Sequence, residues 1–570
     1  MHHRLALASL LLLSSSALFA HDLTREAADE RRREVDQLAR ALADPTVAKL
    51  PVEETTELRL KFLEQPAALV RVSNADDGRA IQLPGEIHRA LNWYSLADGV
   101  KLRLPRRKLK IEAIRGLETL LVSSEVDLTS GAAQSLEIKL RSVFKAASRG
   151  LRSGNTHLHL KDLSFDEMDR YLRLVPKTDG LDVVFISHLE RKPDDKNYIS
   201  NILTRADLER LSQSGTQFGN GEEHRHNFGP GDEGYGHVMF LNIQQLIQPV
   251  SIGPGIMRTG TDAPPLRAGL EEAKRQGATI IWCHNRFGLE DVPSWLGDRL
   301  HAQNINDGGP HHGSYDETYY RYLNLGLKVP FSTGTDWFVD DFSRVYVPLG
   351  HGAERDHEMH PAEWLKQLER GKSTITNGPL LLFSAHCNGK QYQIGDEIKL
   401  DKSEFVTIRG HGVGRHDFRA LEVVFNGRVV GTVPTEKQPG DVFVVNMSKQ
   451  LTLTESGWLA LRIPDKDQPK HELDRPLFAH TSPIYVEIGG KKPFDRPTAE
   501  KLMAEMKRAL EVIPKRGTFA NDAERERVLE VYREGIRNLE YRMKPAAAPV
   551  VPAKPKSPSF DKLTVPGAPK

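Results

Sequence analysis

Side chains that can bind metal ions gather around a series of short apolar runs in the middle of the chain. Most of them come directly after such a run, which is typical of a buried strand. In chain order these candidate ligands are His157, His159, His188, Glu222 or Glu223, His237, His284 and Asp336. Imidazoles combined with a carboxylate suit Zn, Mn or Fe. The sequence therefore predicts a divalent metal site.

The spacing of these residues indicates how they meet. His157 and His159 are two positions apart, so both imidazoles lie on the same side of an extended strand. In a β/α barrel the carboxyl ends of the strands converge on one face, which brings residues just past them into one pocket. A single histidine after a strand is more often a core or loop residue, but the whole set favours a metal site.

The elements that must position these residues alternate between helix and strand from Gly154 to about Ser384. The helical patterns 165–175, 265–276 and 315–325 each precede an apolar run, at 181–186, 278–283 and 327–331. Repeated helix-then-strand units indicate a parallel sheet or barrel. We therefore expect residues 151–384 to form the metal-binding domain.

The flanking segments have a different pattern. Apolar and polar residues alternate in residues 58–150 and again in 385–491, and Asn426-Gly427 is a strong hairpin signal in the second segment. We expect two β-sandwich-like domains that support the structure or bind a glycan or a protein partner. Residues 21–57 and 492–544 are expected to be helical, the latter as a helical pair. The tail 545–570 is rich in Pro, Ala and Lys and is expected to be disordered.

Length, charge and the first residues exclude several classes of protein. A chain of 570 residues is too long for one core. Its 78 basic and 77 acidic side chains provide no overall field for nucleic acid, and its two cysteines provide no disulfide framework. Residues 1–20 are typical of a signal peptide, because the apolar run is too short to span a bilayer. We expect an exported protein, periplasmic or extracellular, without stable membrane insertion after signal removal.

The order of these motifs resembles the PHP superfamily, and most closely its CehA/McbA-type metallohydrolases, over about residues 154–379. The resemblance includes Asn377-Gly378-Pro379 and implies a distorted β/α barrel with metals at its carboxyl face. It implies that His157 and His159 form the opening His-x-His motif and that Gly221-Glu222-Glu223 supplies Glu223 as the bridging ligand. It likewise assigns His188, His237, His284 and Asp336 to later motifs.

The chain departs from that family at two positions. Ser187 stands where the second motif usually has Asp, and Phe338 stands where the last motif usually has His. Both departures weaken the third metal position, so we expect one or two divalent ions. A non-catalytic, metal-containing binding or scaffold protein then becomes an alternative.

The favoured function is hydrolysis of an ester, amide or carbamate bond in a small-molecule or polymer substrate by metal-activated water. Asp336 or His188 is expected to accept the proton from water, and Arg286 to stabilise negative charge. Arg225 and Arg344 are further candidates for that role, with surface or supporting ion pairs as the alternative. A metal-dependent phosphoesterase is the nearest other enzyme class.

Overall fold

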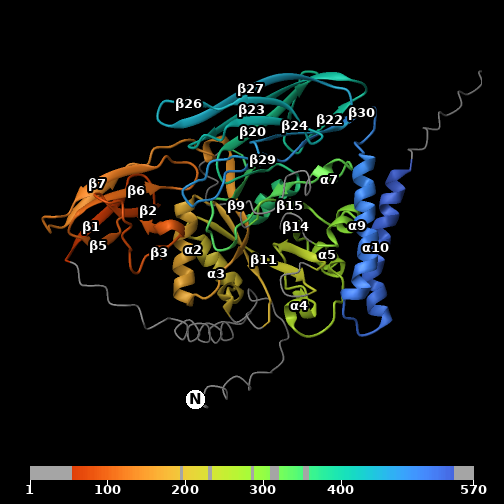
Figure 1. Cartoon of the computed structure of the whole chain (residues 1–570), viewed down its shortest axis with the longest axis horizontal. Helices are drawn as coiled ribbons and strands as arrows, with labels where there is room; N and C mark the ends of the chain where they lie inside the picture. Colours follow the sequence, from red (N-terminus) through yellow and green to blue (C-terminus); the bar gives the residue numbers. More distant parts are fainter. Residues whose placement is uncertain are drawn as a thin grey trace, which may run out of the picture.

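The computed structural model describes residues 54–192, 197–228, 234–283, 288–307, 320–350 and 359–544. The expected signal peptide, most of the 21–57 segment, the 545–570 tail, His284 and Arg286 lie outside these ranges. The described chain is mixed α/β, with strands in several sheets and helices around the central ones (Figure 1). Among the described residues, no helix is both long and apolar enough to cross a membrane.

The N-terminal strands form two sheets around one hydrophobic cluster. Their bounds are β1 (Thr55–Phe62), β2 (Ala67–Asn74), β3 (Ile87–His88), β4 (Tyr94–Ala97), β5 (Lys101–Pro105), β6 (Lys108–Ile114), β7 (Val122–Asp127) and β8 (Gln134–Ile138). The sheet orders are β5-β1-β8 and β3-β4-β2-β6-β7. Alternate residues such as Leu58 and Leu60 of β1 and Val70 and Val72 of β2 are buried in the shared cluster, as the period of two predicts.

The central unit contains the alternating helices and strands. They are β9 (Leu151–His159), α2 (Phe165–Asp179), β10 (Val183–His188), α3 (Arg205–Ser212), β11 (Gln217–His226), β12 (Gly236–Leu241), β13 (Ser251–Ile252), α4 (Pro254–Met257), α5 (Leu266–Arg275), β14 (Thr279–Trp282), α6 (Asp291–Leu296), β15 (Ala302–Asn304), α7 (Arg321–Leu323), β16 (Phe331–Ser332), β17 (Asp336–Trp337), β18 (Arg344–Pro348), α8 (Pro361–Glu369) and β19 (Thr374–Thr376).

Helix α2 shows how local sequence sets these elements. Ser164 and Glu167 form a capping box at its start, and Gly180 ends it with a φ of 66°. Met168, Leu172 and Val175 share the buried face, which packs into a cluster with strands β9 and β10. The helix therefore covers one side of the strand pair that begins the central sheet.

The pairing of the central strands is mostly, but not wholly, parallel. Strands β9, β10 and β11 pair in parallel, as do β14, β15 and β16. Strand β12 is antiparallel to both β11 and β14, which departs from the expected parallel sheet. The reason is the short connection between β11 and β12, since neighbouring parallel strands need a long crossover. Strand β17 pairs in parallel with β9, so the strand order returns to its starting strand.

The C-terminal β segment contains β20 (Leu380–Cys387), β21 (Lys390–Gln393), β22 (Glu397–Leu400), β23 (Glu404–Gly414), β24 (Ala420–Phe425), β25 (Arg428–Pro434), β26 (Glu436–Gln438), β27 (Val442–Leu453), β28 (Gly457–Arg462), β29 (Ala479–Thr481) and β30 (Ile484–Ile488). The predicted Asn426-Gly427 hairpin is confirmed: it joins β24 to β25, and both residues have positive φ. The expected boundary at residue 384 falls inside β20. Strand β29 pairs with β19, which joins this segment to the central sheet.

The predicted helical pair is confirmed as α9 (Arg496–Arg516) and α10 (Asp522–Met543), which lie side by side at the edge of the central unit (Figure 1). Their apolar residues, among them Met506 and Tyr532, join the main hydrophobic cluster. The turn between them is tied to the central sheet through Asp262, whose Oδ2 accepts the backbone N–H of Thr518 at 2.6 Å. Oδ1 of the same carboxylate lies 2.8 Å from Nε2 of His226 in β11.

Candidate metal centre

Strand β9 positions the two histidines of the His-x-His motif. The strand is buried along almost its whole length, and Gly154 lets it pass close to the Trp364 ring, where a Cβ would come within 2.4 Å of the indole. His157 and His159 point to the same side, as their spacing predicts. Their Nε2 atoms lie 3.0 Å apart, and both side chains are inaccessible to solvent or nearly so.

Strand β11 supplies the carboxylate and separates the two glutamates. Oε2 of Glu223 lies 3.0 Å from Nε2 of His159 and 3.8 Å from Nε2 of His157. Glu222 points to the opposite face, because neighbouring residues of a strand alternate. There it accepts the backbone N–H of Ile247 at 2.8 Å. Of the two glutamates considered from the sequence, the structure thus places Glu223 at the histidines.

Asp336 completes the group from strand β17. Its Oδ1 lies 3.4 Å from Nε2 of His157 and 3.9 Å from Nε2 of His159. Asp336 and Phe338 have φ values of 59° and 57°, a left-handed backbone that costs free energy in residues other than glycine and that concentrates at functional sites. Asn155 stabilises this turn, because its Oδ1 accepts the N–H of Thr335 at 3.3 Å.

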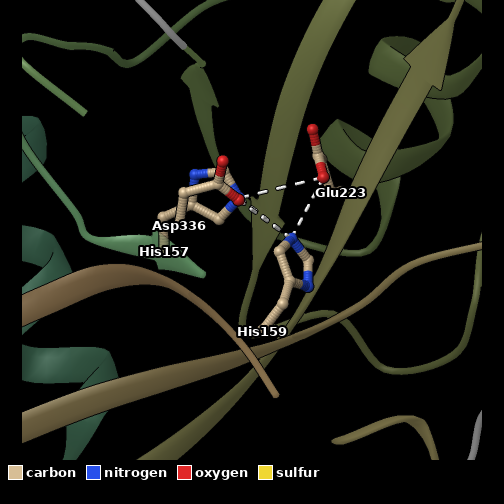
Figure 2. A group of neighbouring side chains, drawn as sticks. All are labelled: His157, His159, Glu223 and Asp336. Carbon is tan, nitrogen blue, oxygen red and sulfur yellow. Dashed lines mark hydrogen bonds and ion pairs between the residues drawn. The ribbon is translucent and has the colours of Figure 1, made fainter. Parts of the chain in front are cut away.

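These four side chains form a group that can hold a metal ion (Figure 2). Their ligand atoms all lie within 4.8 Å of one another, and the contacts given above span 3.0–3.9 Å. Neighbouring ligand atoms of a tetrahedral site with bonds of about 2.0–2.2 Å are about 3.3–3.6 Å apart. The spacing of the donor atoms therefore fits a single divalent ion.

The hydrogen bonds at the far side of each imidazole support this fit. Nδ1 of His159 lies 2.9 Å from the carbonyl oxygen of Ser187, which can only accept, so this nitrogen carries the hydrogen. Nδ1 of His157 lies 2.7 Å from a carboxylate oxygen of Asp307. In the neutral rings both Nε2 atoms then face the cluster with lone pairs. Two lone pairs and two carboxylates then converge, and such a set of acceptors can hold a cation.

The pKa directions of His157 and Glu223 show how charge is distributed in the cluster. Burial opposes protonation of His157, but the carboxylates of Asp307 and Asp336 outweigh burial and raise its pKa well above the ordinary value. Burial also opposes ionisation of Glu223, but Arg225 and the three histidines beside it lower its pKa well below the ordinary value. The carboxylates around His157 thus favour positive charge at this ring, and Glu223 stays ionised beside it.

Two buried residues next to the cluster were not among the predicted ligands. Asp307 and Cys283 form with His157 a second group whose ligand atoms lie within 4.8 Å of one another. Burial, with Glu223 as the next cause, raises the pKa of the Cys283 thiol well above its ordinary value, so this thiol stays protonated. Asp307 follows the short strand β15, so it occupies the same kind of strand-end position as the predicted ligands.

Other predicted ligands are placed beside the cluster or outside the described chain. His237 reaches Glu223, with Nδ1 at 3.1 Å from Oε1, but it does not belong to the four-residue group. His188 lies at the end of β10 with Nε2 3.5 Å from Oε1 of Glu190, and it is also outside that group. His284 and Arg286 lie outside the described residues.

Of the arginines considered for charge stabilisation, Arg225 lies beside the cluster and Arg344 does not. Arg225 lies near the cluster, with Nη1 at 3.5 Å from Oε2 of Glu223 and a side chain 13% exposed. Arg344 is buried and donates to the carbonyl oxygens of Phe342 and Asp179, so its role is structural. This fits the supporting role that the sequence left open for Arg344, because β18 directs the guanidinium into the contact with α2.

An aromatic group lies beside the cluster. The ring of Trp337 lies 5.2 Å from that of His159 and 5.3 Å from that of Tyr198, and Nζ of Lys161 lies 5.2 Å from the Trp337 ring centre. Phe338, at the position where the resembled family has His, packs instead against Tyr171 at 5.7 Å. The described residues thus supply no further imidazole from this motif.

A comparison with models of known protein families gave no match to this sequence, and a comparison with curated proteins gave none either.

Proposed function

We propose that this chain is an exported metal-dependent hydrolase of the PHP type, with one or two Zn, Mn or Fe ions at the cluster. The observation that carries the proposal is the convergence of His157, His159, Glu223 and Asp336 within 4.8 Å. The helix-then-strand order and the return of β17 to β9 support a distorted β/α barrel. Periplasmic or extracellular location follows from the signal-like residues 1–20.

A bound divalent ion supplies Lewis acidity and lowers the pKa of water, which makes water a nucleophile near neutral pH. The chain's own residues hold and orient the reactants. Asp336 is 24% exposed, whereas His157, His159 and Glu223 are at most 2% exposed, so Asp336 is the group of this set that solvent reaches. We assign Asp336 as the acceptor of the proton from water, ahead of His188. Arg225, 3.5 Å from Glu223, is the cation that we assign to developing negative charge.

The proposed substrate is a small molecule or polymer with an ester, amide or carbamate bond. A phosphoester is the alternative, because Arg225 beside Glu223 provides a cation for phosphate oxygens. The proposal includes no nucleic-acid partner and no stable membrane insertion after removal of the signal peptide. A non-catalytic metal-containing scaffold is the alternative of another class, and the packing of Phe338 against Tyr171 favours it, since a usual ligand position is apolar.

The first experiment is metal content by elemental mass spectrometry on protein purified without a metal-binding tag. We expect one to two equivalents of Zn, Mn or Fe, lost in the His157→Ala/His159→Ala variant. The matched control removes two imidazoles outside the cluster, His88→Ala/His360→Ala, and keeps the metal. Ester, carbamate and phosphoester substrates then distinguish the hydrolase classes. Protein without metal after reconstitution with Zn or Mn rejects both the hydrolase and the metal-containing scaffold.

A further inference from the structure

A groove of about 720 Å³ lies where the sheet of β20, β23 and β27 meets the edge of the central unit. One wall comes from the sheet, and the other includes Arg149, Leu151 and Pro348 at the ends of β9 and β18. No residue of the metal cluster lines the groove. Its volume is in the range of sites that hold small organic ligands.

The sheet wall presents polar side chains in two rows across the strands. Ser384, Arg409 and Ser448 are direct cross-strand partners in one row. His411 and Asn446 are partners in the next row, with Nδ1 of His411 at 2.9 Å from Oδ1 of Asn446. Since that oxygen accepts from the imidazole, the amide N–H groups of Asn446 are directed to other partners. The wall therefore offers hydroxyl, amide and guanidinium groups side by side.

The charge of the groove has one sign. Arg149, Lys372 and Arg409 line it, and no Asp or Glu does so among the described residues. Lys372 has a carboxylate partner, Asp396, at 3.7 Å. Within the described part of the chain, neither arginine side chain has a carboxylate at ion-pair distance. Two exposed guanidinium groups thus face a concave surface without compensating charge.

We propose that this groove binds an acidic oligosaccharide, a short sugar chain that carries carboxylate or sulfate groups. Guanidinium groups bind such oxyanions through paired N–H donors. The serine hydroxyls and the Asn446 amide match sugar hydroxyls, and the aliphatic Leu151 and Pro348 match the apolar faces of sugar rings. A nucleic-acid strand is disfavoured because Phe383, the aromatic residue of the lining, is only 5% exposed and gives no stacking platform.

Isothermal titration of the whole protein with a tetragalacturonate tests the proposal, with maltotetraose as the neutral partner of equal length. We expect binding of the acidic sugar that weakens between 50 and 300 mM NaCl, and little binding of the neutral one. Arg409→Ser and Arg149→Ser should each weaken binding about tenfold or more. Arg428→Ser, which removes an exposed arginine of the same β segment outside the groove, should leave the affinity unchanged.

A second titration uses a sulfated tetrasaccharide, which tests whether the groove binds sulfate groups as well as carboxylates. Binding of either acidic sugar with loss in both groove variants supports the site. Equal binding of maltotetraose, unchanged affinity in both groove variants, or inorganic sulfate binding as tightly as the oligosaccharides overturns it. Because the metal cluster does not line the groove, protein treated with a chelator should bind the sugar normally, and this separates the proposal from that of hydrolysis.

Discussion

Oδ2 of Asp307 lies 2.7 Å from Nδ1 of His157, although 150 positions separate the two residues. Both side chains are inaccessible to solvent, and Asn304 donates to the same Oδ2 at 3.0 Å. A carboxylate in this position fixes the tautomer and the orientation of a metal-binding imidazole and makes its other nitrogen a better ligand. Asp307 is therefore a positioning residue for the proposed centre.

Asp307→Ala should lower the affinity for Zn or Mn about 10- to 100-fold, because His157 loses the group that holds its tautomer. Competition with a chromogenic chelator measures this affinity. Asp307→Asn, which keeps an accepting oxygen, should lose less. Asp465→Asn removes an exposed carboxylate and serves as the control. An affinity unchanged in the alanine variant would contradict the positioning role.

The neighbouring glutamates of β11 make a matched pair of variants. Glu223→Gln should lose the metal, since the carboxylate between the histidines becomes a neutral amide. Glu222→Gln should keep the metal and destabilise the fold by about 1–3 kcal/mol. The two buried oxygens of Glu222 face the N–H of Ile247 and Nδ1 of His224, and an amide keeps only one accepting oxygen. Metal content and urea unfolding of both variants check the prediction. Metal loss from Glu222→Gln alone would reverse the assignment.

Gly334 is the position where the turn before Asp336 passes β9. A Cβ there would lie 2.4 Å from Cβ of His157 and 3.0 Å from Oδ1 of Asp307. Gly334→Ala should therefore push His157 and the turn that carries Asp336 apart. This change should lower the metal affinity and destabilise the fold by about 1–3 kcal/mol. Metal titration and thermal unfolding measure the two effects. A variant with wild-type affinity would show that the turn can yield without moving the ligands.

Acid should weaken the junction between the N-terminal and C-terminal β segments. Arg415 donates to Glu472 at 2.6 Å and to the carbonyl oxygen of Gly116, also at 2.6 Å. Burial opposes ionisation of Glu472, but Arg415 and His416 outweigh it and hold its pKa well below the ordinary value. The resulting stability is present above the unfolded-state pKa of a glutamate and is lost as the pH falls through the folded one.

Glu472→Gln removes the contribution to folding stability that depends on the ionisation of Glu472. It should destabilise the protein by about 3–5 kcal/mol near neutral pH, because Arg415 stays buried without a counter-charge. Its unfolding midpoint should then depend less on pH below about 4.5 than that of the wild type. Denaturant unfolding at a series of pH values measures both. Parallel pH curves for the two proteins would exclude Glu472 as the source.

Sequence alone predicted the elements and ligands that depend on strict periodicity. The spacing of His157 and His159 placed both rings on one side of β9, and the alternation of Glu222 and Glu223 explains why only one reaches the histidines. Asp307 was not predicted because the strand before it, β15, has only three residues and no apolar run in the sequence. The antiparallel direction of strand β12 was not predicted either, since apolar composition does not reveal strand direction. Both depend on contacts between distant segments.

The contact that joins β11 to the turn between α9 and α10 has a consequence for the order of events during synthesis. Asp262 links His226 to Thr518, so the strand that carries Glu223 is secured by a residue made almost 300 positions after it. A growing chain can form β9 and β10 long before that link exists. The proposed centre should therefore bind its ion late, after the helical pair α9 and α10 has packed against the central unit. A chain truncated before Thr518 should be the form most prone to remain metal-free.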